Sequence, residues 1–184
     1  MTTKAVRNHG NFIVGPSDIF VGAYGESKEN ARDVGITQGG ISYNKESEFK
    51  EFDDADQYLG VIGVAKIGER LETTFTLKEN VLENMKLAWG LPDDALDEAE
   101  NILYFGTSPK VEYKTLYVEG PAPGGGTANY EFWKAFPISA SEVENTKDDN
   151  TVYEVTMLIL EDITKPEIQR FGKRTDTYDD TTPP

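Results

Sequence analysis

Alternation of apolar and polar residues constrains this chain more than any other pattern, and it is clearest over residues 57–77. One parity carries the apolar side chains, interrupted by Glu69 and Thr73: Ala65, Ile67, Leu71, Phe75 and Leu77. The other parity carries the polar side chains Lys66, Arg70, Glu72, Thr74 and Thr76. Because successive side chains of a strand point to opposite faces, the pattern predicts strands with one buried and one wet face. We expect two strands here, joined near Ile67-Gly68-Glu69.

Runs of aromatic and β-branched residues predict further strands along most of the chain. They cover residues 18–21, 33–43, 102–105 with 110–119, 130–139 and 151–162. Turn signals separate them, among them Gly15-Pro16-Ser17, the glycine-rich connector 120–126 and the polar loop 145–150. Gly39 and Gly40 lie inside one run and predict a β-bulge or a tight backbone contact.

A change of spacing predicts one helix at about residues 79–89. Its apolar side chains recur at helical intervals: Val81, Leu82, Met85, Ala88 and Trp89. Gly90-Leu91-Pro92 then supplies a stop signal. The fold class expected is therefore mainly β, an antiparallel β-sandwich or barrel with one flanking α-helix, long loops and extended termini.

The length of 184 residues suits one domain, and we expect a single β domain over residues 1–164. Residues 165–184 are charged, rich in Thr and Asp and nearly free of aliphatic side chains. That composition predicts a C-terminal extension that orders only on contact with another chain, if at all.

Residues 44–56 weaken the alternation, because charged side chains crowd around Phe49 and Phe52. The segment predicts either a long exposed hairpin or a charged loop. Its charged residues include Lys45, Glu46, Glu48, Lys50, Glu51, Asp53 and Asp54.

The formal charge is −15, from 33 acidic and 18 basic residues. This excess of acidic residues argues against a protein that binds nucleic acid tightly, because neutralising phosphates requires a surface rich in Lys and Arg. It does not argue against a protein that DNA slides past, since an acidic wall repels phosphates and keeps a conduit free of sticking points.

The sequence has few of the residues on which catalytic sites commonly depend. The chain has no cysteine and a single histidine, His9, which excludes thiolate nucleophiles and leaves no zinc ligand set. Acidic pairs such as Glu69 with Glu72, or Asp53 with Asp54, are expected by chance among 33 acids. We therefore expect no enzyme activity, no cofactor and no metal. No secretory or membrane-spanning apolar run is present, so we expect synthesis and assembly in a cytoplasm.

The order of short motifs in the first half of the chain resembles that of bacteriophage major tail tube proteins. The motifs are Gly15-Pro16-Ser17-Asp18-Ile19-Phe20-Val21-Gly22, Asp33-Val34-Gly35-Ile36-Thr37-Gln38-Gly39-Gly40-Ile41, Gly60-Val61-Ile62-Gly63, Leu71-Glu72-Thr73-Thr74-Phe75-Thr76-Leu77-Lys78-Glu79, and the predicted helix Asn80 to Trp89 ending in Gly90. The second half shares only its strand-rich character.

The resemblance implies a virion protein of the phage tail, assembled in the bacterial host cytoplasm. It implies hexameric rings that stack into a tube, with double-stranded DNA passing through without specific binding and no membrane partner. The implied partners are other copies of the chain, the tape measure protein, the tail terminator and the baseplate or tail-tip proteins.

Two groups of residues are candidates for roles in such a tube. The candidate lumen-facing residues are Lys66, Arg70, Glu72, Thr74 and Thr76, with Glu112 or Glu154 adding negative charge. The candidate stacking loop between rings comprises Lys45, Glu46, Glu48, Lys50, Glu51, Asp53 and Asp54.

Two other functions stay open at this point. The inner tube of a contractile injection or secretion system shares the implied fold and the acidic conduit. A carbohydrate-binding β-sandwich is the third possibility, suggested by the aromatic residues Tyr117, Tyr130 and Trp133.

Overall fold

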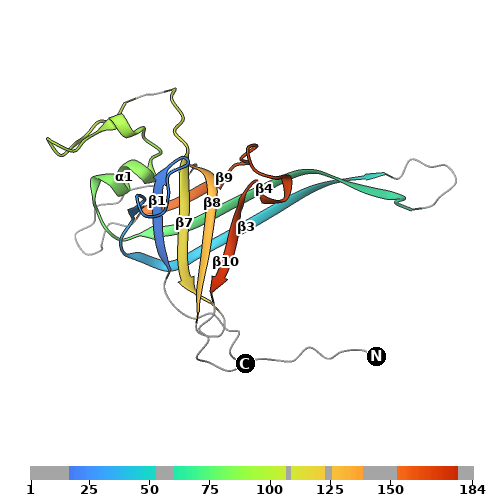
Figure 1. The fold of residues 1–184 in the computed structure, drawn as a ribbon. Helices are drawn as coiled ribbons and strands as arrows, with labels where there is room; N and C mark the ends of the chain where they lie inside the picture. Colours follow the sequence, from blue (N-terminus) through green and yellow to red (C-terminus); the bar gives the residue numbers. More distant parts are fainter. Residues whose placement is uncertain (1–16, 53–59, 107–108, 123–125, 139–152, 178–184) are drawn as a thin grey trace.

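The computed structural model describes residues 17–52, 60–106, 109–122, 126–138 and 153–177 (Figure 1). The expected turn over 145–150 and the residues His9, Asp53 and Asp54 lie outside these ranges. The described elements confirm a mainly β, antiparallel, sandwich-like fold with one α-helix, and the sheet does not close into a barrel within these ranges.

Eight strands form one bent antiparallel sheet that folds into two layers. The first layer contains β2 (Arg32–Asp33), β1 (Asp18–Ala23), β7 (Lys114–Pro121), β8 (Thr127–Pro137) and β10 (Gly172–Thr177). The second layer contains β9 (Tyr153–Ile159), β4 (Gly63–Leu77) and β3 (Thr37–Phe52). In Figure 1, β3 and β4 cross behind the strands of the first layer.

Strand β8 joins the two layers because two strands share one of its edges. Residues 127–132 of β8 pair with β10, whereas residues 135–137 pair with β9. The other edge of β8 pairs with β7. The sheet therefore forks along β8, and the two branches enclose the core.

The core fills the space between the layers with side chains of alternating parity. On β4 the buried residues are Thr73, Phe75 and Leu77, as the sequence alternation predicts. The other contributors are Ile19 and Val21 of β1, Leu116 and Val118 of β7, Phe132 and Ala135 of β8, and Tyr153, Val155, Met157 and Ile159 of β9. Each large apolar side chain buried here stabilises the fold by about 1.5–3 kcal/mol.

The predicted pair of short strands over 57–77 is wrong, because β4 is one continuous strand from Gly63 to Leu77. The pairing of β4 with β3 shifts register between Glu48 and Phe49 of β3, where Ile67 becomes an extra residue on β4. This shift is a β-bulge rather than a turn.

The charged segment 44–56 is a strand of a long hairpin as far as it is described, since β3 extends to Phe52. Its antiparallel partner is β4, and Figure 1 shows the two strands continuing past the sandwich. We call the projecting part, Lys45–Phe52 with Gly63–Arg70, the hairpin arm. Of the two predictions for this segment, the exposed hairpin is therefore confirmed for residues 44–52, and the charged loop is not.

The Gly39-Gly40 pair forms the predicted bulge. Both glycines have positive φ angles, 77° and 79°, and the β3–β4 register shifts between Gln38 and Ile41. Residues other than glycine rarely adopt a backbone conformation with positive φ, which explains why two adjacent glycines lie inside a long strand.

The helix α1 (Leu82–Ala88) lies within the predicted range, and Gly90 follows its end at a φ angle of 61°. The buried side chain of Asn84 connects α1 to the sheet and to the preceding loop through three hydrogen bonds of 2.9–3.1 Å. Its amide donates to the carbonyl oxygens of Val34 and Glu79 and its carbonyl oxygen accepts from Arg32. The loop after α1 contains the 3-10 helix η2 (Asp93–Ala95) and a separate two-stranded pair, β5 (Leu96–Asp97) and β6 (Ile102–Leu103).

The segment expected to be a C-terminal extension, from Lys165 on, contains η3 (Glu167–Gln169) and β10 in its described part. Strand β10 pairs with β8 over six residues, and Phe171 packs against the core. Backbone pairing at a sheet edge needs no apolar side chains, so a polar strand such as Gly172–Thr177 leaves no sequence signal. No helix in the described ranges is long and apolar enough to cross a membrane.

Replacing Asn84 with alanine should destabilise the fold by about 1–3 kcal/mol, because it leaves buried hydrogen-bonding groups without partners. Urea unfolding of Asn84→Ala measures the loss. Glu100→Ala, an exposed change in the loop that follows α1, is the control and should leave the unfolding midpoint within error. Equal midpoints for the two variants would contradict the anchoring role of Asn84.

Candidate functional site

The outer face of the second layer is mostly polar, and Leu158 of β9, which faces Glu72, is an apolar exception. On β4 it presents Arg70, Glu72, Thr74 and Thr76, the parity opposite to the buried residues. Their register partners are polar on β3, Ser42 facing Thr74 and Asn44 facing Glu72, and on β9 Thr156 faces Thr74. The hydroxyl oxygens of Thr74 and Thr156 lie 3.0 Å apart in a hydrogen bond. We call this surface the polar sheet face.

The charge of the polar sheet face is mildly negative. Its one arginine, Arg70, donates from Nε to Glu72 at 2.6 Å and faces Glu46 on β3. Glu154 of β9 faces Thr76, so one of the two acids expected to add charge lies on this face. Glu112 does not, since it lines a cavity beside α1.

Lys66 does not share this face with the other four candidate residues. It is the register partner of Phe49, and its ammonium group is paired with Glu69, which also pairs with Lys45 at 3.0 Å. The cause is the bulge at Ile67, because one extra residue reverses the parity of every side chain beyond it. Whether the other four residues line a lumen stays a prediction.

Five of the seven residues predicted to form a stacking loop lie on β3, and the other two, Asp53 and Asp54, lie outside the described residues. Lys45, Glu46, Glu48, Lys50 and Glu51 are strand residues, so they alternate between the two faces of the hairpin arm. Lys50 lies over the ring of Phe52, 5.8 Å from its centroid. The described part of the candidate stacking loop is therefore one strand of a projecting two-stranded ribbon, and its role between rings stays a prediction.

One face of the hairpin arm continues the core-facing surface, and no described residue outside the arm covers it. Tyr43 is partly exposed but still packs against the first layer, with its ring stacked on that of Tyr130 at a centroid distance of 4.8 Å. The same parity of β3 continues along the arm to Phe49. On β4, pairing with β9 ends at Leu71. Phe49, Val64 and Ile67 are consequently 57%, 60% and 57% exposed. We call these three residues the apolar arm surface.

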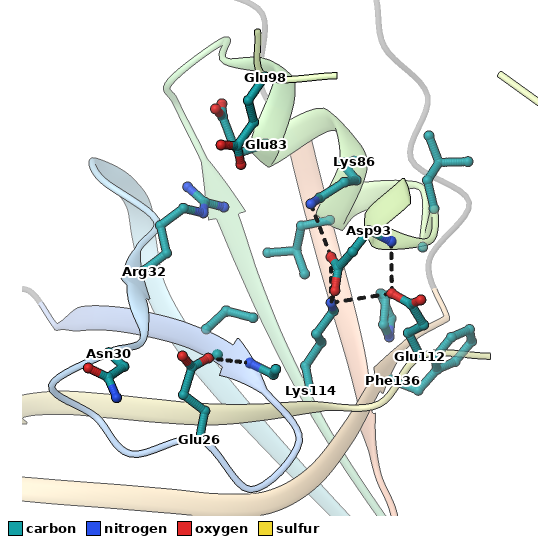
Figure 2. Close-up of a pocket in the computed structure, with 17 residues that line it drawn as sticks. Glu26, Asn30, Arg32, Glu83, Lys86, Asp93, Glu98, Glu112, Lys114 and Phe136 are labelled. Atoms are coloured by element: carbon teal, nitrogen blue, oxygen red, sulfur yellow. Dashed lines mark hydrogen bonds and ion pairs between the residues drawn. The ribbon is translucent and has the colours of Figure 1, made fainter. Parts of the chain in front are cut away.

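A cavity of about 320 Å³ lies between the end of β1, the helix α1 and the end of β8 (Figure 2). Its apolar wall consists of Val21, Leu87, Leu91, Phe136 and Pro137. Its charged residues are Glu26, Arg32, Glu83, Lys86, Asp93, Glu98, Glu112 and Lys114. The sequence carries no pattern that brings these distant residues together, so the cavity was not predictable.

Asp93 holds the loop after α1 against the sandwich. Its carboxylate accepts from Lys86 at 3.0 Å and from Lys114 at 2.7 and 2.8 Å, and its backbone N–H donates to Glu112 at 2.7 Å (Figure 2). Burial alone would raise the pKa of Asp93, but hydrogen bonds and charges from Lys114 and Lys86 outweigh it and lower the pKa to about 2.

Arg32 lies more deeply on the same cavity. Burial lowers its pKa, while the negative charges of Glu83, Asp33 and Glu79 oppose that shift. Its direct hydrogen-bond partners are neutral, the backbone oxygen of Asp33 and the side chain of Asn84. Within the described ranges, no three His, Asp or Glu side chains lie close enough together to hold a metal ion.

The three aromatic residues considered for carbohydrate binding all have internal partners. Tyr117 donates to the carbonyl oxygen of Glu26 at 2.6 Å, and Tyr130 lies between Tyr43 and Arg174. Trp133 donates to the carbonyl oxygen of Gln169 at 2.7 Å, and two lysine ammonium groups lie 4.4 and 5.2 Å from its ring centroid. This arrangement does not favour a sugar-stacking platform.

Comparison with known proteins shows a likeness of fold. No protein-family model matches the chain, and no curated protein sequence matches it. Among solved structures, it is similar to a chain from the sixfold-symmetrised cryo-EM structure of the anti-feeding prophage baseplate. That alignment has 6% identity and a TM-score of 0.50, and it covers 97% of this chain and 98% of the other, which shows a shared fold.

Two further solved structures align with lower scores. One is the sheath-tube complex of the extracellular contractile injection system PVC in its extended state, with 15% identity, 78% and 83% coverage and a TM-score of 0.46. The other is the virion of a native gene transfer agent particle, with 10% identity, 94% and 99% coverage and a TM-score of 0.41.

The ion pairs of Asp93 should contribute stability that depends on pH. Because the folded-state pKa of about 2 lies below the ordinary value of 3.8, the contribution is fully present above pH 3.8 and is lost as the pH falls towards 2. The difference in urea midpoint between the wild type and Asp93→Asn should therefore shrink over this range. Ala99→Ser, an exposed change in the same loop that removes no titrating group, should show a difference that stays constant. A difference in urea midpoint for Asp93→Asn that does not change with pH would contradict the lowered pKa of Asp93.

Proposed function

We propose that this chain is a structural subunit of a phage tail tube, which polymerises as stacked hexameric rings around a conduit for genome delivery. The observation that carries the proposal is the apolar arm surface, which continues the core-facing parity and is left without a cover by the described part of its own chain. The fold shared along nearly the full length of a chain from a sixfold-symmetric baseplate supports it. The role is structural and not catalytic.

The hairpin arm gives a physical reason for self-assembly. A two-stranded ribbon is marginally stable by itself in water, and long unpaired strand edges favour association with another chain. Among the residues that the structure describes, no third strand and no second layer accompany the arm beyond the sandwich. Contact with another copy would cover Phe49, Val64 and Ile67, and each buried side chain would contribute about 1–3 kcal/mol.

The polar sheet face is the proposed wall of the conduit. It carries hydroxyl groups and carboxylates, and Glu72 neutralises its one arginine. A surface of this kind stays hydrated and offers no cluster of free cations to DNA phosphates, so DNA would pass without specific binding. The tape measure protein, the tail terminator and the baseplate or tail-tip proteins are the proposed partners of the finished tube.

The inner tube of a contractile injection system is the second candidate. The fold shared with a chain of the anti-feeding prophage baseplate favours it as much as the phage tube. The two candidates differ in cargo, because the injection system moves protein rather than DNA. Identification of the material inside native particles separates them.

The purified chain should form rings or tubes with sixfold symmetry, visible by negative-stain electron microscopy. Assembly should depend on concentration, since each contact is made between copies. Protein that stays monomeric in sedimentation across concentration and salt, with no rings on the grid, would rule out the tube.

The double change Phe49→Ser and Val64→Ser should abolish assembly while the monomer stays folded, because both side chains are exposed in the single chain. The matched control is Lys50→Ser with Ala65→Ser, a register pair on the opposite face of the hairpin arm. Size-exclusion chromatography and circular dichroism report assembly and folding. Equal assembly of the two double variants would show that the apolar arm surface is not an interface.

A further inference from the structure

The cavity beside α1 contains acidic groups that form no hydrogen bond or ion pair with the described part of the chain. Asp93 and Glu112 are engaged by lysines, and Glu26 accepts from the backbone N–H of Ala23 at 2.7 Å. Glu83 and Glu98 have no hydrogen bond or ion pair within 4.0 Å in the described part of the chain, although the charge of Arg32 is felt at Glu83. The cavity therefore offers two carboxylates beside an apolar wall, a combination suited to a basic side chain with an apolar neighbour.

Residues 1–17 supply such a combination within the same sequence. They form the longest stretch of the chain without an acidic residue, and they contain Lys4 and Arg7. Val6 stands next to Arg7. In a chain of net charge −15, this stretch is the segment most attracted to an acidic surface.

The positions of the segment and the cavity favour contact between different copies. The segment joins the folded body at Asp18, the first residue of β1, whereas the cavity is lined by Val21, Gly22 and Ala23 at the other end of that strand. Six strand residues span about 20 Å. The segment thus leaves one end of the layer and the cavity opens at the other, so copies stacked in the same orientation bring the two together.

We propose that the stretch Lys4–Arg7 of one copy docks into this cavity of the copy in the next ring. Arg7 pairs with Glu83 and Glu98, and Val6 packs against the wall formed by Leu87, Leu91 and Phe136. The cavity volume of about 320 Å³ is at the small end for binding sites, which suits a few side chains. The inference rests on the proposed tube and assigns the partner surface to a ring-to-ring contact. Such a head-to-tail contact repeats without closing and so extends a stack.

A charge exchange tests the docking in the full-length chain. Arg7→Glu and Glu98→Lys should each raise the critical concentration for tube growth about tenfold, the effect of losing about 1.4 kcal/mol per contact. The double variant Arg7→Glu with Glu98→Lys should restore growth, because the pair is re-formed with its charges exchanged. Lys78→Glu, an exposed lysine outside the cavity, makes the same change of net charge as Arg7→Glu and should have little effect.

Disulfide trapping gives an independent readout, because the chain has no cysteine of its own. A mixture of His9→Cys and Ala99→Cys copies should yield a cross-linked dimer on mild oxidation of assembled tubes. Arg7→Glu tubes that grow like the wild type, or a cross-link that forms only within a chain carrying both cysteines, would overturn the docking and leave the tube intact. Failure of the unaltered chain to form rings would instead overturn the proposed function and the docking with it.

Discussion

The division of one edge of β8 between two partners is the constraint on which the rest of this structure depends. A strand offers one line of backbone donors and acceptors on each side, and β8 gives its first half to β10 and its last residues to β9. This sharing forces the continuous sheet to fork into two layers that face each other. The core side chains of β1, β7, β8, β9 and β4 meet only because of that fork. A substitution that disrupts the pairing of β8 with β9 or β10 would therefore affect both layers at once.

The same fork explains why the hairpin arm is exposed. The first layer and β9 are short, so they cover β3 and β4 only as far as Tyr43 and Leu71. The two long strands continue with the same inward parity, and Phe49 and Val64 occupy positions where a core would stand if the cover were longer. An apolar stripe on an isolated ribbon is a liability in a monomer and an advantage in an assembly. The mismatch of strand lengths thus connects the fold to the proposed function.

The sequence predicted elements whose side chains carry a periodic signal and missed those held by backbone or by distant charges. The alternation over 71–77 and the helix before Gly90 were found because apolar residues repeat with the period of the element. Lys66 was placed on the wrong face because a single extra residue at Ile67 reverses parity without changing composition. Strand β10 was missed because its pairing with β8 uses backbone groups. Asp93 and Lys114 are 21 positions apart, and nothing local marks their contact.

The acidity of the chain is compatible with the proposed assembly because the excess charge is unevenly distributed. Copies of net charge −15 repel one another beyond direct contact, although salt screens this repulsion over about 8 Å at physiological ionic strength. Contacts therefore form most easily through surfaces that carry no excess charge. The described part of the hairpin arm has this property, with Lys45, Lys50, Lys66 and Arg70 balanced by Glu46, Glu48, Glu51 and Glu69. Residues 1–17 are basic, so they can approach an acidic cavity. In the proposed tube an acidic face can then stay unpaired, and its repulsion of phosphates would suit the wall of a conduit for DNA.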